Sequence, residues 1–261
     1  MKDILKWCAI GDSFTYLNDH LEETGFRLKK GYLTHTAEKL KFPVHIANLG
    51  INGSATSDWL NKELEEADFY TILLGTNDWF SRHTPLGNEE DFQSKREGTI
   101  VGNLACILNM IRKYADKAPI IVMTPVERGD FVYIENPKNM AHGSYQPENG
   151  LKLAEVSEEI CKVVRGNQIY LLDLHKQGGF TAENAVYFKR LNINGEIKDV
   201  SYPDYIGLSY NPDKDLYPYP KEAAYMTYDG LHPSDLGCER IAELLANRLN
   251  PILHSIKNKE T

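Results

Sequence analysis

Five nearly continuous apolar runs constrain the fold of this 261-residue chain more than any other feature of the sequence. They read ILKWCAI, VHIANLG, FYTILLG, PIIVMTP and IYLLDL, and they occupy residues 4–10, 44–50, 69–75, 119–125 and 169–174. Continuous apolar runs predict strands that are covered on both faces. Helical patterns separate them, over roughly residues 27–41, 55–66, 95–116, 150–165 and 234–256. Because strands that alternate with helices form parallel sheets, the sequence predicts an α/β fold: a flavodoxin-like, three-layer α/β/α sandwich around a five-stranded parallel sheet.

Two long segments interrupt this alternation. Residues 126–149 are rich in Pro, Asn and Gly, and residues 175–228 contain Asn194-Gly195 between strand-like flanks, which predicts a hairpin with a type I′ turn. The end of the second segment, residues 202–228, holds seven of the fifteen tyrosines. Long excursions in an α/β domain serve function more often than connection. We therefore expect one domain over residues 1–261, with insertions at about 126–149 and 175–228.

Composition restricts the classes of partner and the compartment. The chain has 29 Lys and Arg against 37 Asp and Glu, a formal net charge of -8, which argues against nucleic acid and anionic membranes as partners. No apolar stretch is long enough to span a membrane, and the four cysteines show no disulfide or metal spacing. The first ten residues are too short for a secretory signal, so we expect a cytoplasmic protein, or an extracellular or periplasmic one if a leader was removed. The oligomeric state stays open.

Polar and glycine-rich motifs follow three of the predicted strands and precede the last predicted helix. They are Gly11-Asp12-Ser13, NLGING at 48–53, GTND at 75–78 and DGLHPS at 229–234. Ligands of open α/β sheets bind beyond the carboxyl ends of the strands, where these motifs should gather. Each alone has a structural explanation: Ser13 as a helix cap, the glycines as turn residues, and the Asn, Asp and His side chains as partners in turns.

Together these residues divide the tasks of acyl transfer. Ser13 would attack an ester carbonyl, His232 would move the proton, and Asp229 would hold the imidazole. The backbone N–H groups of Ser13 and Gly53 and the side-chain amide of Asn77 would bind the developing oxyanion. This chemistry requires no metal and no cofactor.

The same motifs resemble those of a known family, the SGNH or GDSL-type hydrolases. GDSFT is similar to its nucleophile block, with Phe14 where leucine is commoner, and the NLGING, GTND and DGLHP segments are similar to its three further blocks, in the family's order. The resemblance implies the nucleophile Ser13, the acid/base pair Asp229 and His232, and an oxyanion hole of Ser13, Gly53 and Asn77. It also implies the flavodoxin-like fold. Gly53 rather than Gly50 is assigned by aligning the second glycine of NxGxxG.

Other polar residues receive lesser predictions. Asp12 would support the turn after the first strand, and Asp78 would be an orienting hydrogen-bond partner. His83, His142 and His175 have no metal-ligand spacing, so no metal site is predicted. The chain also lacks the GxSxG and GxGxxG patterns of α/β-hydrolases and dinucleotide-binding proteins.

These observations predict a metal-independent serine esterase that removes short acyl groups, acetyl above all, from a small-molecule or carbohydrate ester. The tyrosines of residues 202–228 suggest the sugar, because aromatic faces stack on sugar rings; the alternative is that they pack this segment onto the domain. A lysophospholipase or acyl-thioesterase with the same site is a second hypothesis. A carbohydrate-binding protein without catalysis is a third, and a flavin-binding protein is a further hypothesis that rests on the fold class alone.

Overall fold

A parallel sheet forms the middle layer of the molecule, which a computed structural model describes over residues 4–166 and 168–259. Its strands, in spatial order, are β2 (Val44–Asn48), β1 (Leu5–Gly11), β3 (Phe69–Leu73), β4 (Ile120–Met123) and β7 (Ile169–Leu172). All four neighbouring pairs are parallel. The predicted flavodoxin-like sandwich with a five-stranded parallel sheet is confirmed.

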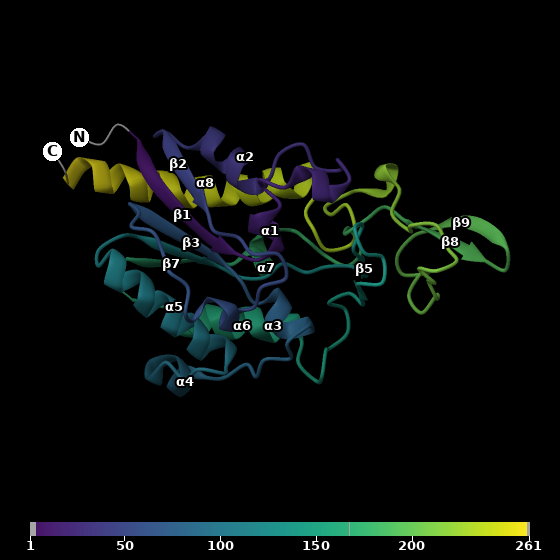
Figure 1. The fold of residues 1–261 in the computed structure, drawn as a ribbon, viewed down its shortest axis with the longest axis horizontal. Helices are drawn as coiled ribbons and strands as arrows, with labels where there is room; N and C mark the ends of the chain where they lie inside the picture. Colours follow the sequence, from purple (N-terminus) through teal and green to yellow (C-terminus); the bar gives the residue numbers. More distant parts are fainter. Residues whose placement is uncertain (1–3, 167, 260–261) are drawn as a thin grey trace.

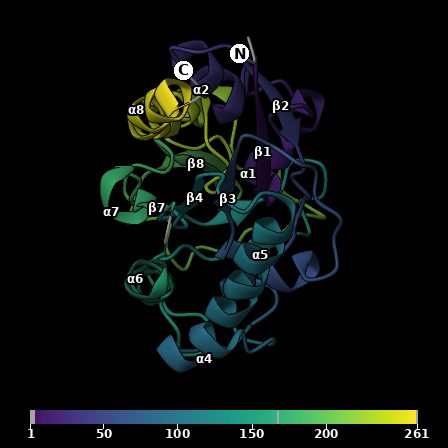
Figure 2. The same ribbon diagram turned by 90° about the vertical axis from the view of Figure 1, so that its left-hand side faces the viewer.

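Helices cover both faces of the sheet. One face carries α2 (Tyr32–Lys39) and α8 (Asp235–Lys259), which pack against each other and lie in the upper part of Figure 1. The opposite face carries α5 (Ile100–Tyr114) and α6 (Leu153–Val163), with α4 (Glu89–Ser94) outside them, and Figure 2 shows these three helices together below the sheet. No helix among the described residues is long and apolar enough to cross a membrane.

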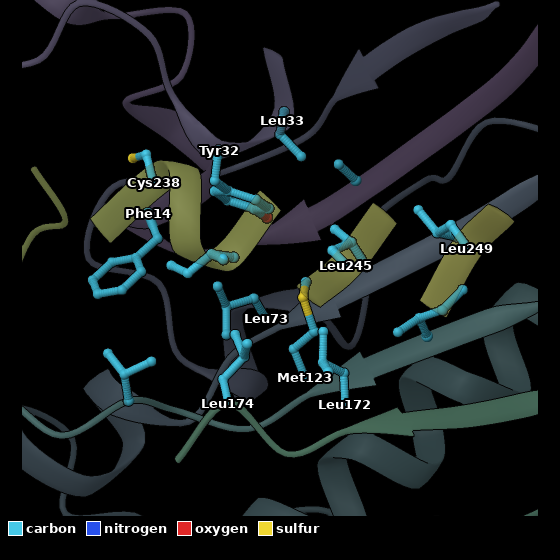
Figure 3. Close-up of a cluster of buried hydrophobic side chains, with 14 of the residues drawn as sticks. Phe14, Tyr32, Leu33, Leu73, Met123, Leu172, Leu174, Cys238, Leu245 and Leu249 are labelled. Atoms are coloured by element: carbon cyan, nitrogen blue, oxygen red, sulfur yellow. The ribbon is translucent and has the colours of Figure 1, made fainter. Parts of the chain in front are cut away.

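Alternate residues of the central strands enter two different cores. In β1, Trp7 and Ala9 belong to the core under α2 and α8, whereas Cys8 and Ile10 belong to the core under α5 and α6. Figure 3 shows the first of these cores, in which Leu245 and Leu249 of α8 face Met123 and Leu172 from the strands. Both sides of the central strands β1, β3 and β4 are thus largely removed from water, which is why their sequence runs are apolar, whereas His45 of the edge strand β2 is exposed.

Several predicted helices are shorter in the structure. The prediction for residues 55–66 is wrong beyond a single 3-10 turn, η2 (Thr56–Trp59). The following chain is irregular because the Tyr70 hydroxyl donates to the carbonyl of Glu65 and accepts from the N–H of Ala67, which removes these groups from a helix. The helix predicted over residues 95–116 is also too long. In the structure α5 begins at Ile100, where the Thr99 hydroxyl caps its first turn, and ends at Tyr114.

The remaining elements are short and lie mostly beyond the carboxyl ends of the strands. They are α1 (Ser13–Tyr16), η1 (Leu21–Thr24), α3 (Thr76–Phe80), β5 (Phe131–Val132), β6 (Met140–Ala141), α7 (Leu174–Gln177), β8 (Lys189–Ile193), β9 (Glu196–Val200) and η3 (Lys221–Ala223). The hairpin of β8 and β9 extends away from the sheet in Figure 1. Asn194 and Gly195 both have positive φ, 55° and 89°, as a type I′ turn requires.

The two insertions contact each other at this end of the sheet. The hydroxyls of Tyr217 and Tyr219, in the second insertion, donate to the carbonyl oxygens of Val132 and Asp130 in the first. The second insertion therefore packs onto the first. That residues 1–261 form one domain stays a prediction.

Candidate active site

Ser13 is the first residue of α1, at the point where β1 ends. The cap of this helix is Asp12, whose carboxylate accepts a hydrogen bond from the N–H of Phe14 at 3.1 Å. Ser13 is therefore not the cap, and the structural explanation of this serine is wrong. Its hydroxyl lies 2.9 Å from Nε2 of His232 instead.

His232 and Asp229 lie in the loop before α8 and are almost completely buried. Nδ1 of His232 is 2.7 Å from Oδ2 of Asp229. The other carboxylate oxygen, Oδ1, accepts hydrogen bonds from the backbone N–H groups of Leu231 and His232. An ionised carboxylate only accepts hydrogen bonds, so the imidazole proton sits on Nδ1 and the Nε2 lone pair points to Ser13. The structure thus brings together the three residues that the sequence proposed as catalytic.

Aromatic rings surround the imidazole and fix its plane. The ring of Tyr228 stacks on it with a centroid distance of 5.8 Å, and the ring of Phe131 meets it edge-on at 5.3 Å. Phe14, beside the serine, lies 5.9 Å away in a tilted arrangement. The side chain of His232 is only 3% exposed. Because the ring is packed on several sides, it stays within hydrogen-bonding distance of Ser13.

The three predicted oxyanion donors line the same cavity as His232. Within the described ranges, the backbone N–H groups of Ser13 and Gly53 have no hydrogen-bond partner. The amide nitrogen Nδ2 of Asn77 donates one hydrogen to the carbonyl of Ser54 at 3.0 Å, which leaves its second hydrogen available. The arrangement can offer three N–H groups to an oxygen bound beside Ser13.

Gly50 and Gly53 have different tasks. A Cβ atom at Gly50 would lie 2.2 Å from the backbone nitrogen of Tyr16, so this glycine allows the loop to pack against α1. Gly53 has a φ of +72°, and a Cβ atom there would meet nothing within 4 Å. It lines the cavity, whereas Gly50 does not. This difference supports the assignment of Gly53 to the oxyanion site.

Buried hydrogen bonds connect the loops that carry these donors. Asp78 accepts hydrogen bonds from the backbone N–H of Thr56 at 2.9 Å and from its hydroxyl at 2.5 Å. It is thus an orienting partner, as expected, but it holds the loop after Gly53 rather than the amide of Asn77. Burial raises the pKa of the Asp78 carboxyl. Asn48 connects the glycine loop to α1, since its amide donates to the carbonyl of Thr15 at 2.9 Å.

Asp12 has an unusual electrostatic environment. Its side chain is 2% exposed, and burial raises the pKa of the carboxyl to about 7 although the Phe14 N–H and the nearby His232 favour the charged form. The predicted supporting role at the turn agrees with its hydrogen bond to Phe14. The sequence does not reveal that this carboxyl binds a proton so tightly.

The cavity beside Ser13 has a volume of about 270 Å³. Its walls include several residues that the sequence analysis missed, namely Phe80 at the end of α3 and Arg128, Phe131, Tyr133 and Asn139 from the first insertion. That insertion was marked only as a functional segment, because no periodicity or motif singles out its individual side chains.

The second insertion contributes no residue to this cavity. Tyr205, Tyr219 and Tyr228 are buried, and the hydroxyls of Tyr217 and Tyr219 hold the first insertion. None of the tyrosines of residues 202–228 lines this cavity, so they do not support a sugar site beside Ser13, and the packing alternative describes Tyr217 and Tyr219. They act on the cavity indirectly, by supporting the segment that forms its wall.

Two of the histidines outside the motifs meet at one carboxylate. Nε2 of His142 lies 2.6 Å from Oε2 of Glu148, and Nδ1 of His83 lies 3.6 Å from Oε1 of the same residue, whereas Nε2 of His175 lies 3.6 Å from a carboxylate oxygen of Glu127. Among the described residues, one group has the spacing to hold a metal ion, His20 with Glu22 and Glu23 near the surface. None of the three lines the cavity.

Comparisons with known proteins give the relatives of this chain. The model of the GDSL-like lipase/acylhydrolase family matches residues 9–240. A possible lipase from Chitinophaga pinensis DSM 2588 has 41% identity and a TM-score of 0.91, over 95% of this chain and 98% of that one. No curated protein sequence matches the chain.

More distant solved structures share the fold. A protein from Lactobacillus plantarum has 19% identity and a TM-score of 0.62, over 96% of this chain and 99% of that one. A carbohydrate esterase family 3 protein from Talaromyces cellulolyticus has 13% identity and a TM-score of 0.50, over 97% and 99%. The family match spans all four motifs around the cavity, and the chain belongs to the GDSL-like lipase/acylhydrolase family.

Proposed function

We propose that this protein is a serine esterase that hydrolyses short acyl esters, acetyl esters above all, through a Ser13 acyl-enzyme. The observation that carries the proposal is the buried line of contacts from Ser13 Oγ to His232 Nε2, 2.9 Å, and from His232 Nδ1 to Asp229, 2.7 Å. A hydroxyl is a weak nucleophile by itself, and an adjacent neutral imidazole that is held by a carboxylate activates it. The family's ester chemistry agrees with this arrangement.

In the first half-reaction, Ser13 Oγ attacks the ester carbonyl carbon and His232 Nε2 accepts the hydroxyl proton. The carbonyl oxygen becomes negative and is stabilised by the N–H groups of Ser13, Gly53 and Asn77. When the tetrahedral intermediate collapses, the bond to the alcohol oxygen breaks and His232 gives its proton to the departing alcohol. Asp229 stabilises the imidazolium between these two proton transfers.

In the second half-reaction, water takes the place of the alcohol. His232 Nε2 removes a proton from the water as its oxygen attacks the acyl carbon, and the same N–H groups bind the oxyanion again. Ser13 Oγ then leaves with the proton from His232, and the carboxylic acid is released. The chain's own residues perform every proton transfer, so no metal is part of the proposed mechanism.

The size and the lining of the cavity support a small acyl group. A volume of about 270 Å³ is slightly below the usual range for pockets that bind drug-sized ligands, about 300–1,000 Å³. The wall combines the rings of Phe80, Phe131 and Tyr133 with polar side chains such as Asn52 and Asn139. A lysophospholipase or a long-chain acyl-thioesterase would need a longer apolar channel. The aromatic rings leave a sugar alcohol as a suitable leaving group, since such rings stack on sugar faces.

Hydrolysis of a series of p-nitrophenyl esters tests this function. We expect acetate and propionate to be hydrolysed fastest, with activity lost in Ser13→Ala and retained in Ser94→Ala, an exposed serine of α4. Acetylated monosaccharides then test the alcohol. A preference for octanoate over acetate would contradict the short-acyl proposal, and activity in pure Ser13→Ala would contradict the proposed nucleophile.

A further inference from the structure

The charges around the cavity oppose the charge of the whole chain. The protein has a formal net charge of -8, yet the cavity beside Ser13 is lined by two arginines, Arg82 and Arg128. Among the described residues, its lining contains no aspartate or glutamate. Clefts lined by one sign of charge concentrate ligands of the opposite sign. The lining therefore favours a substrate that carries negative charge.

Arg128 is the more unusual of the two, because its guanidinium is buried at the cavity wall. The residue is 2% exposed. Its Nη2 donates to the carbonyl oxygen of His142 at 2.8 Å, and its planar group lies over the rings of Trp79 and Phe80, 5.2 Å and 4.8 Å from their centroids. The Nε atom is buried and has no hydrogen-bond partner among the described residues.

The carboxylates near Arg128 are bound to other groups. Asp130 pairs with Lys189 at 2.5 Å, Glu148 pairs with His142 at 2.6 Å, and Asp229 holds His232. In the described part of the chain, none of them forms an ion pair with Arg128. An unpaired buried charge is costly, so a ligand carboxylate that completed the pair would stabilise the guanidinium. Burial lowers the pKa of Arg128 to about 10, so the guanidinium is still charged at neutral pH.

Arg82 serves as an internal comparison within the same cavity. Its side chain is 51% exposed, and its Nη2 already lies 3.2 Å from Oδ2 of Asp58. Water and this carboxylate satisfy its charge without a ligand. A charged substrate would therefore gain less from Arg82 than from Arg128, because exposed pairs contribute little.

We propose that the natural ester carries a carboxylate, and that this carboxylate binds the guanidinium of Arg128 while the ester carbonyl lies against Ser13. The inference rests on the proposed esterase function and adds the charge of its substrate. The carboxylate takes no part in the chemistry; it fixes the ester relative to Ser13. A planar guanidinium with free N–H groups matches a carboxylate in shape and charge. Arg128 is thus a specificity-determining residue for acidic esters.

Pairs of esters that differ only in charge test the proposal. On the alcohol side, 3- and 4-acetoxybenzoate are compared with the corresponding acetoxybenzamides. On the acyl side, monoethyl succinate is compared with ethyl butyrate, because ethoxide is too poor a leaving group for the neighbouring carboxylate to expel it without the enzyme. Each rate is divided by the rate of alkaline hydrolysis, which removes differences in intrinsic reactivity. We expect the carboxylate to raise kcat/KM by about tenfold or more in at least one series, mainly through KM, as hydrogen bonds to charged groups typically do.

Variants separate recognition from packing. Arg128→Met keeps the contact with Trp79 and Phe80 but removes the charge, and it should reduce the ratio of acidic to neutral ester to about one. Arg240→Gln is the matched control: this arginine also donates to a backbone carbonyl, that of Gln177, but it lies on α8 outside the cavity. It should leave the ratio at the wild-type value. Arg82→Gln should lower it less than Arg128→Met.

If Arg128→Met does not fold, inhibition of the wild-type protein tests the proposal instead. Benzoate should then inhibit hydrolysis of a neutral acetate ester more strongly than benzamide does. The proposal is overturned if neither ester series shows a preference for the acidic member, or if a folded Arg128→Met keeps that preference. Such a result would leave the esterase function standing, because Ser13-dependent hydrolysis of neutral esters tests that function separately.

Discussion

Nε2 of His232 lies 2.9 Å from Oγ of Ser13, although 219 positions separate the two residues along the chain. The sheet explains this contact. Ser13 follows the carboxyl end of β1, and the N–H of Val132, in the insertion that follows the carboxyl end of β4, donates to the carbonyl of Asp229 in the loop that holds His232. The packing of α8 on the sheet then carries the chain away from the site. The proposed chemistry depends on the contact between Ser13 and His232, and the role of each residue around it can be tested.

The contact between Asp229 and His232 predicts the effect of Asp229→Asn. An asparagine can donate to Nδ1, which favours the wrong tautomer and leaves Nε2 protonated. We expect kcat to fall by about 10³- to 10⁴-fold with the fold intact, which is milder than the loss caused by Ser13→Ala or His232→Ala. Steady-state kinetics with p-nitrophenyl acetate measure this effect. Wild-type turnover in Asp229→Asn would show that Asp229 does not orient the base.

The side-chain amide of Asn77 is the third proposed oxyanion donor. Asn77→Ala should lower kcat by about 10²- to 10³-fold and change KM little, because the lost hydrogen bond strengthens in the transition state. Asn250→Ala is the control, since this asparagine also bonds to backbone groups but lies on α8, next to Lys39 and Lys41. Full turnover in a folded Asn77→Ala would contradict the assignment.

The two glycines of the NLGING segment should respond differently to alanine. Gly50→Ala places Cβ within 2.2 Å of the Tyr16 nitrogen, so we expect a loss of roughly 3 kcal/mol or more in the free energy of unfolding. Gly53→Ala only strains a positive φ, at a cost of about 1–2 kcal/mol, and adds its methyl group in open space beside the oxyanion site. Urea unfolding of both variants measures the difference. Equal losses would contradict the distinction between these glycines.

The raised pKa of Asp12 predicts how stability depends on pH. The unfolded carboxyl releases its proton near its ordinary pKa of 3.8, whereas burial in the folded protein raises this pKa to about 7. The folded state therefore binds more protons in this interval, and the free energy of unfolding should fall as the pH rises from about 4 to 7. Asp78, whose pKa is also raised by burial, contributes in the same direction.

Asp12→Asn removes the titration of Asp12 and keeps an oxygen that can accept from the Phe14 N–H. We expect a smaller decline of stability between about pH 4 and 7 than in the wild type, measured by urea unfolding at a series of pH values. Asp204→Asn, at an exposed position, should keep the wild-type decline. Identical pH profiles for Asp12→Asn and the wild type would show that Asp12 does not bind the proton as tightly as the structure indicates.

The strands, and the meeting of the loops that carry the motifs, can be predicted from the sequence for a shared physical reason. Strands buried on both faces need continuous apolar runs, and the loops at their carboxyl ends must meet at one edge of a parallel sheet. The position of Ser13 after β1 therefore already places it near the loops of Gly53 and Asn77. The contact between Ser13 and His232 is harder to predict from the strand pattern, since it depends on the path of the chain before α8.

The walls of the cavity could not be predicted in the same way. Arg128 and Phe131 lie in an irregular segment, where hydrogen bonds such as that from Tyr217 to Val132 fix the path of the chain. Such contacts join residues far apart in sequence and leave no periodic pattern. The tyrosines of residues 202–228 have a related explanation: their number suggested a sugar site, whereas Tyr217 and Tyr219 bond to the first insertion and Tyr228 stacks on the imidazole of His232.

Covalent labelling of Ser13 by a fluorophosphonate tests the central claim most directly. The reagent forms a stable phosphonyl adduct only with an activated serine, and mass spectrometry of the intact protein and its peptides locates it. We predict one adduct per chain, on Ser13, absent in Ser13→Ala and formed far more slowly in His232→Ala. A wild-type protein that stays unlabelled, or a label on another residue that persists in Ser13→Ala, would contradict the account.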